Sequence, residues 1–214
     1  DNLIYADIQD SSGWDSAPML PAVKLYAKAH LLKDRQRYLK PVYSFRIYCE
    51  HYNHKYGIED SGAYSVPISN SNDLSKICLL WNSALADYRF MGLYRMLLYN
   101  KVPLRRLLDF PSSKAFAGVS RQRPVDVTCR VSVNYSRETI AFHRKMIVRE
   151  LRGYIQNDRL KRFHYLKELR QNKVSISPFG FGEACYRDFE TILAGALLFK
   201  PNMDHLDTWP PIYI

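Results

Sequence analysis

The sequence has 214 residues, of which 47% are hydrophobic and 24% are charged, and it carries a formal net charge of +10. This length allows one large domain or two small ones with a real core, and the composition is ordinary for a folded protein. No stretch approaches the ~20 consecutive apolar residues of a membrane span, which excludes a transmembrane helix within these residues.

The cysteines indicate the cellular compartment, and the first residue bears on whether the chain is complete. The four cysteines lie far apart, without a CxxC pair or histidines at zinc-ligand spacing: Cys49, Cys78, Cys129 and Cys185. We therefore expect free thiols and a cytoplasmic protein. Because the sequence begins at Asp1 without a signal-peptide pattern, we expect a fragment, a processed form or an incomplete chain.

The first half is predicted to contain one strand, Asn2–Ile8, followed mainly by helices. Pro41–Tyr56 is aromatic and basic and is expected to be helical, and Leu74–Leu85 keeps helical spacing after the capping residues of Ser69–Asp73. Tyr88–Leu108 is either a buried connecting helix or a basic amphipathic segment lying on a membrane surface. We place a domain boundary after residue 110, so residues 1–110 form an incomplete, mostly helical region and residues 111–214 form a second domain.

The second half alternates strands with helices of 10 to 18 residues, which predicts a Rossmann-like α/β domain with a parallel sheet. We expect three neighbouring parallel strands at Val125–Cys129, Lys173–Ser177 and Ala196–Lys200. The predicted helices are Ser136–Gly153 and Arg159–Asn172, and Tyr154–Gln156 is a candidate short strand.

A candidate binding loop follows the strand Lys173–Ser177, at the carboxyl end where open α/β sheets bind ligands. Gly180 and Gly182 would let the backbone approach a phosphate, and a helix starting near Glu183 would direct free N–H groups toward it. On that helix Glu183, Arg187, Glu190 and Ala194 fall on one polar stripe. The stripe indicates either carboxylates that bind sugar hydroxyls or a solvated face on which Arg187 bridges both glutamates.

The segment SPFGFGEACYRDFETILAGALLFKPNMDHLDTWPPIY resembles the C-terminal, donor-binding half of group-1 GT-B glycosyltransferases. The matching features are the loop Gly180–Gly182, the "ETILAG" of Glu190–Gly195 and two glutamates, although six residues separate these glutamates where the family has seven. The resemblance covers about Arg123–Tyr213. It implies that Glu190 holds the ribose of a nucleotide sugar, that Glu183 is its weaker companion, and that Gly180, Phe181 and Gly182 line the donor site.

The same resemblance implies roles for basic residues and for an N-terminal domain that faces the donor-binding half. Arg130 and Arg187 are expected to hold the diphosphate, with Arg137 and Arg144 as weaker candidates. A general base is expected on the opposing N-terminal domain, and three aspartates follow the first predicted strand there: Asp7, Asp10 and Asp15. We name none of them as the catalytic residue, and His205 is expected to be an ordinary loop residue near the cleft.

Together these features predict a glycosyltransferase that moves a sugar from a nucleotide diphosphate sugar to a glycan, lipid or other acceptor, as in polysaccharide biosynthesis. We expect no cofactor and no metal, because the sequence lacks a D-x-D triplet. The alternative is a basic nucleic-acid-binding or membrane-surface protein without catalysis. Arg144–Lys173 contains ten basic and three acidic residues, whereas Val174–Ile214 contains two basic and five acidic residues. The positive charge is thus outside the site segment, so nucleic acid is not the expected partner.

Overall fold

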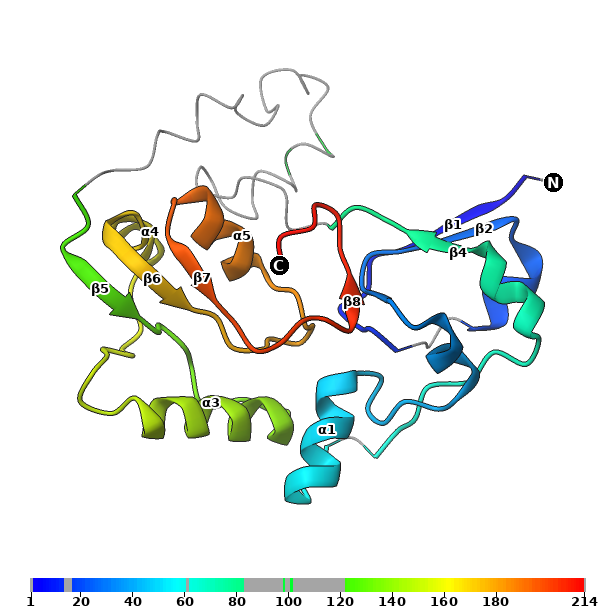
Figure 1. The fold of residues 1–214 in the computed structure, drawn as a ribbon, viewed down its shortest axis with the longest axis horizontal. Coiled ribbons are helices and arrows are strands. Elements are labelled where there is room, and N and C mark those ends of the chain that lie inside the picture. Colours follow the sequence, from blue (N-terminus) through cyan, green and yellow to red (C-terminus); the bar gives the residue numbers. More distant parts are fainter. Residues whose placement is uncertain are drawn as a thin grey trace.

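Two parallel sheets organise the protein in a computed structural model that describes residues 2–13, 17–60, 62–82, 98, 101 and 122–213. The N-terminal sheet contains β1 (Ile4–Asp7), β2 (Leu25–Lys28) and β4 (Ile77–Leu79) in the order β1-β2-β4. The C-terminal sheet contains β5 (Val125–Thr128), β6 (Asn172–Ile176) and β7 (Leu197–Phe199) in the order β5-β6-β7. The two sheets lie at opposite ends of the molecule (Figure 1). The protein is therefore a mixed α/β structure.

The helices differ in length and in how they end. The described α-helices are α1 (Ile47–Tyr56), α3 (Glu138–Glu150), α4 (Arg162–Gln171) and α5 (Tyr186–Leu193), and the 3-10 helices are η1 (Ala17–Ala22), η2 (Arg35–Leu39) and η3 (Ser71–Lys76). Helix α1 ends at Gly57, whose φ of 66° is left-handed and favours glycine. Helix α4 packs on β5 and β6, and α5 packs on β7.

A short antiparallel pair connects the two halves of the chain. Strand β3 (Leu31–Leu32) pairs with β8 (Leu206–Asp207), although 170 or more residues separate them in the sequence. Arg35 adds an ion pair to Asp207 at 2.9 Å. The larger hydrophobic cluster also draws on both halves, since Tyr26 and Leu31 share it with Phe179 and Leu206.

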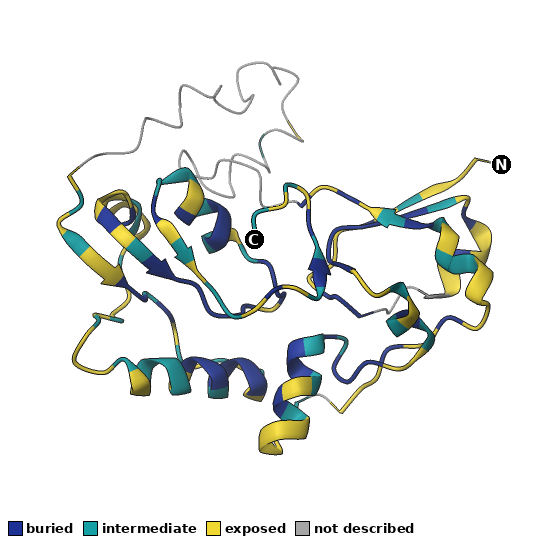
Figure 2. Ribbon diagram, viewed as in Figure 1, coloured by how far each residue is buried: buried dark blue, intermediate teal, exposed yellow. Residues whose placement is uncertain are grey.

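The ends of α1 and α3 that approach each other are buried (Figure 2). The Tyr52 hydroxyl of α1 lies 2.5 Å from Nδ1 of His143 on α3. Burial, together with the nearby Lys200 and Arg144 cations, lowers the pKa of His143 to about 4, so this ring is neutral at neutral pH. The contact joins the two halves through uncharged groups.

Several sequence predictions are confirmed. The strand expected within Asn2–Ile8 is β1, and the three strands expected in the second half are parallel neighbours, as predicted. The helices expected at Ser136–Gly153 and Arg159–Asn172 are α3 and α4. The four cysteines are free.

The prediction of a single strand in the N-terminal region was wrong, because β2 and β4 are strands as well. Leu74–Leu85 is not one helix: η3 ends at Lys76 and β4 begins at Ile77. These strands are only four and three residues long, and runs this short have no measurable period.

Two further predictions were wrong in extent. The chain from Pro41 to Arg46 is not helical, and positive φ angles at Ser44 (50°) and Phe45 (62°) interrupt it before α1. Tyr154–Gln156 forms no strand. The domain boundary after residue 110 and the segment Tyr88–Leu108, apart from Leu98 and Lys101, lie outside the described residues.

Candidate functional site

A pocket of about 820 Å³ lies where the carboxyl ends of both parallel sheets converge. Asp10, three residues after β1, and Asn82, three residues after β4, line it from the N-terminal half. The loops after β5 and β6, the N-terminal turns of α4 and α5, and Arg144 of α3 supply the remaining walls. Loops at the carboxyl ends of parallel strands are the usual ligand sites of open α/β sheets. A volume of this size accommodates a small organic ligand.

The loop from Phe179 to Ala184, between β6 and α5, is held by side chains of the N-terminal half. Arg46, buried at the start of α1, donates to the carbonyl oxygens of Phe181 and Asp10. The Tyr48 hydroxyl donates to the carbonyl of Gly180 at 2.9 Å. Because these donors occupy loop carbonyls, they fix the backbone that forms one wall of the pocket.

The two loop glycines have different surroundings. A Cβ atom at Gly182 would lie 2.8 Å from Cε1 of His30 and 3.1 Å from Cβ of Asp10, closer than packed atoms tolerate. At Gly180 the nearest atoms would be 3.6 and 3.9 Å away, which is ordinary contact. Only Gly182 is therefore required by close packing, and its neighbours belong to the opposite half.

Glu183 is fully buried in the loop, which corrects the prediction that it lies on the polar stripe of the helix. Helix α5 begins at Tyr186, so Glu183 precedes it. Its carboxylate accepts a hydrogen bond from the Ser12 hydroxyl and lies 3.6 Å from Nδ1 of His30. Burial alone would raise the pKa of Glu183, but His30 and Ser12 lower it below its ordinary value. Glu183 is thus a structural anion between the halves and does not line the pocket.

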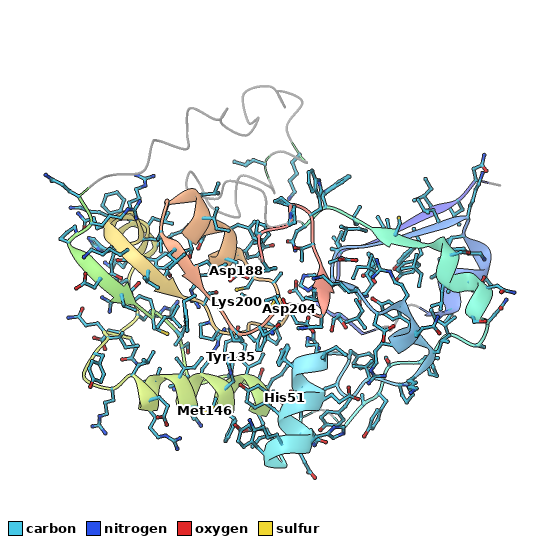
Figure 3. The ribbon with its side chains drawn as sticks, viewed as in Figure 1. His51, Tyr135, Met146, Asp188, Lys200 and Asp204 are labelled. Atoms are coloured by element: carbon cyan, nitrogen blue, oxygen red, sulfur yellow. The ribbon has the colours of Figure 1, made fainter. Side chains whose placement is uncertain are left out.

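Asp188 fixes both ends of the same loop. Its buried carboxylate accepts hydrogen bonds from the Ser177 hydroxyl at 2.5 Å, where β6 ends, and from the Cys185 backbone N–H at 2.9 Å, where α5 begins. Lys200, directly after β7, lies 3.0 Å away, and the two side chains lie close together beside α5 (Figure 3). The Tyr213 hydroxyl is a further donor at 2.6 Å.

Five arginines line the pocket: Arg130, Arg144, Arg159, Arg162 and Arg187. Arg130 binds both carboxylate oxygens of Glu168 at 2.9 and 2.6 Å. Arg144 donates to the carbonyl oxygens of Phe179 and Ser132. The arginines outnumber the two lining carboxylates, Asp10 and Glu190, so the pocket favours an anion.

The remaining three arginines are the most available to a ligand. Arg187 donates to the backbone carbonyl of Arg130 at 2.8 Å, and its Nε is buried without a hydrogen-bond partner among the described residues. Arg162 lies 3.1 Å from Glu190 and is about half exposed. Arg159 is exposed, and within the described part of the chain it makes no ion pair. Arginine is well suited to phosphate because its planar guanidinium can donate two parallel hydrogen bonds.

Glu190 lies on the pocket wall, where its side chain is 14% exposed. Its partner is Arg162 of α4, which differs from the predicted alternative of a bridge through Arg187. Tyr165 lies beside this pair, and burial, reinforced by the Glu190 carboxylate, raises the pKa of its hydroxyl. This hydroxyl therefore stays protonated at neutral pH.

Of the seven predicted donor-binding residues, six line the pocket: Gly180, Phe181, Gly182, Arg130, Arg187 and Glu190. Glu183 does not. Arg144, a weaker candidate, also lines the pocket, whereas Arg137 lies 5.8 Å from the Phe181 ring centroid. Among the aspartates considered for the opposing half, Asp10 lines the pocket, Asp7 is buried against Lys28 at 2.8 Å, and Asp15 lies outside the described residues.

The prediction missed Arg159, Arg162, Arg46 and the pair of Asp188 with Lys200. Asp188 had a usable signal, since an acidic residue three positions after a helix cap commonly bonds back to the backbone N–H of that cap. Arg46 had none, because its partners are carbonyl groups of segments distant in sequence.

No cluster of three or more His, Cys, Asp or Glu side chains among the described residues is arranged to hold a metal ion. No described helix has the length and apolar character needed to cross a membrane.

Comparison of the sequence with protein-family models and with curated proteins found no match.

Proposed function

We propose that the protein is a metal-independent glycosyltransferase of the GT-B type, which binds a nucleotide diphosphate sugar in the arginine-lined pocket. In this proposal each parallel sheet belongs to a Rossmann-like unit, and the pocket is the cleft between the units. The resemblance of residues 177–213 to GT-B donor-binding halves supports this reading. The convergence of two sets of strand ends on one pocket supports it independently, since that resemblance does not include β1 or β4.

The observation that carries the proposal is the pairing of arginines with a wall carboxylate in a single pocket. A diphosphate needs cationic donors, and Arg159, Arg162 and Arg187 can supply them. A ribose needs an acceptor for its two hydroxyl groups, and Glu190 can supply it. A simple anion site would need only the arginines, so the carboxylate specifically favours a ligand with both phosphates and vicinal hydroxyls.

The chemistry follows from the same groups. When the sugar is transferred, the bond from its anomeric carbon to the diphosphate oxygen breaks, and negative charge grows on the leaving diphosphate. Arginine side chains held in place before the reaction stabilise that charge. Arg162 neutralises Glu190, so a ligand that binds the carboxylate through hydroxyls would free Arg162 for a phosphate oxygen.

Substitution of Glu190 by Gln tests the proposal. Charge-assisted hydrogen bonds contribute about 1.5–3 kcal/mol, so loss of the charge should weaken binding of a nucleoside diphosphate by roughly tenfold or more. Isothermal titration with UDP, GDP and ADP would measure this in parent and variant. Glu150→Gln is the matched control, because Glu150 is 65% exposed on α3 and does not line the pocket.

The proposal predicts that the parent binds at least one of the three nucleotides and that only Glu190→Gln is impaired. Equal affinity in the parent and Glu190→Gln would show that Glu190 does not bind the nucleotide. Failure of the parent to bind any nucleoside diphosphate or nucleotide sugar would overturn the proposed function.

A further inference from the structure

The C-terminal turn of α3, the loop that follows it and α4 lie at one end of the molecule (Figure 1), and they carry exposed basic and aromatic side chains. We call this surface the basic end and define it by six exposed side chains, namely Arg152, Tyr154, Lys161, Phe163, Lys167 and Arg170. Three of them, Phe163, Lys167 and Arg170, are spaced four and three residues apart on α4, so they share one helical face. The arginine-lined pocket does not include any of these six residues.

The charges of the basic end are not neutralised by neighbouring acids. None of its four cations makes an ion pair with a described residue. The acids of the region are mostly engaged elsewhere, since Glu168 binds Arg130 and Glu150 binds Arg149. Asp158 is the one exposed acid of residues 151–171. The surface therefore attracts an anionic partner.

Two aromatic rings project from this charged surface. Tyr154 is 85% exposed and Phe163 is 74% exposed, the largest values among the exposed large hydrophobic residues described. Transfer of a Phe ring with so much contact to water into an apolar phase is favourable, because it removes apolar surface from water. Phe163, Lys167 and Arg170 also line a groove of about 580 Å³, with Leu166 and Pro124 as apolar neighbours. Cations beside apolar groups match a lipid surface, which presents anionic headgroups above acyl chains.

From this charge and apolar complementarity we infer that the basic end docks the protein onto a membrane surface rich in anionic lipids, with Phe163 and Tyr154 entering the interface. Single-stranded nucleic acid is less well matched, because such proteins align successive aromatic rings along one groove. Here the two rings are nine positions apart, one on a turn and one on a helix. The inference does not depend on the proposed function.

Sedimentation with extruded vesicles tests the inference in the full chain. Vesicles of phosphatidylcholine mixed with phosphatidylglycerol should carry the protein into the pellet, whereas vesicles of phosphatidylcholine alone should not. Binding should fall as salt is added, because surface charge attraction is screened within about 10 Å at 0.1 M salt. Failure of the parent protein to bind the anionic vesicles would overturn the inference.

Charge reversal gives the first variant pair. Each Lys near an anionic surface strengthens binding by roughly fivefold, so Lys161→Glu combined with Lys167→Glu should lower the partition coefficient by about 25-fold or more. The control combines Lys40→Glu with Lys55→Glu, which makes the same charge change at exposed positions of the N-terminal half. Equal losses in the two double variants would show general charge attraction and would contradict docking through the basic end.

Substitution of an exposed phenylalanine gives the second pair of variants. Phe163→Ser should lower binding roughly tenfold, whereas Phe199→Ser should not, although Phe199 on β7 is 63% exposed and chemically identical. Circular dichroism spectra would show that both variants are folded. A gel shift with single-stranded RNA supplies the competing outcome: if the lysine variant lost RNA binding but kept vesicle binding, the basic end would serve nucleic acid and the inference would be wrong.

Discussion

A carboxylate removed from water is stable only when hydrogen bonds or opposite charges replace its hydration. Glu183 accepts a hydrogen bond from the Ser12 hydroxyl of the other half of the chain, and Nδ1 of His30 lies 3.6 Å from its carboxylate. The position matched a family motif in the sequence, yet its side chain stabilises the contact between the halves and is closed to ligands. A glutamate in a glycine-rich loop can thus have a structural role beside a binding site.

Glu183→Gln should lower the free energy of unfolding by about 2 kcal/mol at neutral pH, because a buried charge-assisted hydrogen bond is lost while the side-chain shape is kept. The pKa of Glu183 is lowered in the folded protein, so its ionised form stabilises the fold above the ordinary carboxyl pKa of about 4.3. That stabilisation is lost as the pH falls through the lowered folded value. Urea unfolding at pH values from about 7 to 3 would measure the difference between parent and variant.

The difference should therefore be largest at neutral pH and should shrink on acidification. Glu150→Gln, at an exposed position on α3, should change stability little at any of these pH values. A Glu183→Gln variant that is as stable as the parent at neutral pH would contradict the structural role.

At the scale of elements, the loop between β6 and α5 is shaped by the packing at Gly182. Gly182→Ala should destabilise the protein by about 1–3 kcal/mol, because the added methyl group would overlap His30 and Asp10. Gly180→Ala should be nearly neutral for folding, since its new methyl group meets only ordinary contacts. Thermal unfolding of the two variants would compare them directly, and equal shifts in melting temperature would show that Gly182 is not closely packed.

Elements with a long periodic pattern or a clear alternation with helices could be predicted from the sequence. Helix α3, with 13 residues, and the β5-β6-β7 sheet are of this kind. Strands β2 and β4 could not be predicted, because they are short and their pairing is decided by contacts distant in sequence. Strand β8 is only two residues long and exists through its pairing with β3.

The candidate site was predictable to the extent that its residues are local to one loop and helix. Gly180, Phe181 and Gly182 were found because turn residues and a following helix signal a loop in the sequence. The start of α5 was misplaced by three residues, and this error put Glu183 on the helix. Arg162 could not be assigned to the site from sequence, since it reaches the pocket only because α4 packs beside α5 residue Glu190.

At the scale of the whole molecule, one hydrophobic cluster extends through both halves, so we expect the described parts to unfold together. Leu31→Ala should lower the free energy of unfolding by about 2–5 kcal/mol, because Leu31 is fully buried in this cluster. Leu197→Ala should have little effect, since Leu197 is 66% exposed on β7. Denaturant unfolding followed by both tryptophan fluorescence and circular dichroism would measure the two variants.

Coincident curves from the two probes, with a shift only in Leu31→Ala, would match a shared core. Two separate transitions, of which Leu31→Ala shifts only one, would instead show that the halves unfold independently.

The pairing of β3 with β8 also constrains when the protein can fold during its synthesis. A ribosome makes the chain from the N-terminus, and domains commonly begin to fold as soon as their residues emerge. The N-terminal half cannot complete its core in this way, because Phe179, Met203 and Leu206 are translated long after Leu31. Until they emerge, the nascent chain holds Leu31 and Leu32 without their final partners. Completion of the N-terminal half is therefore a late step in biosynthesis.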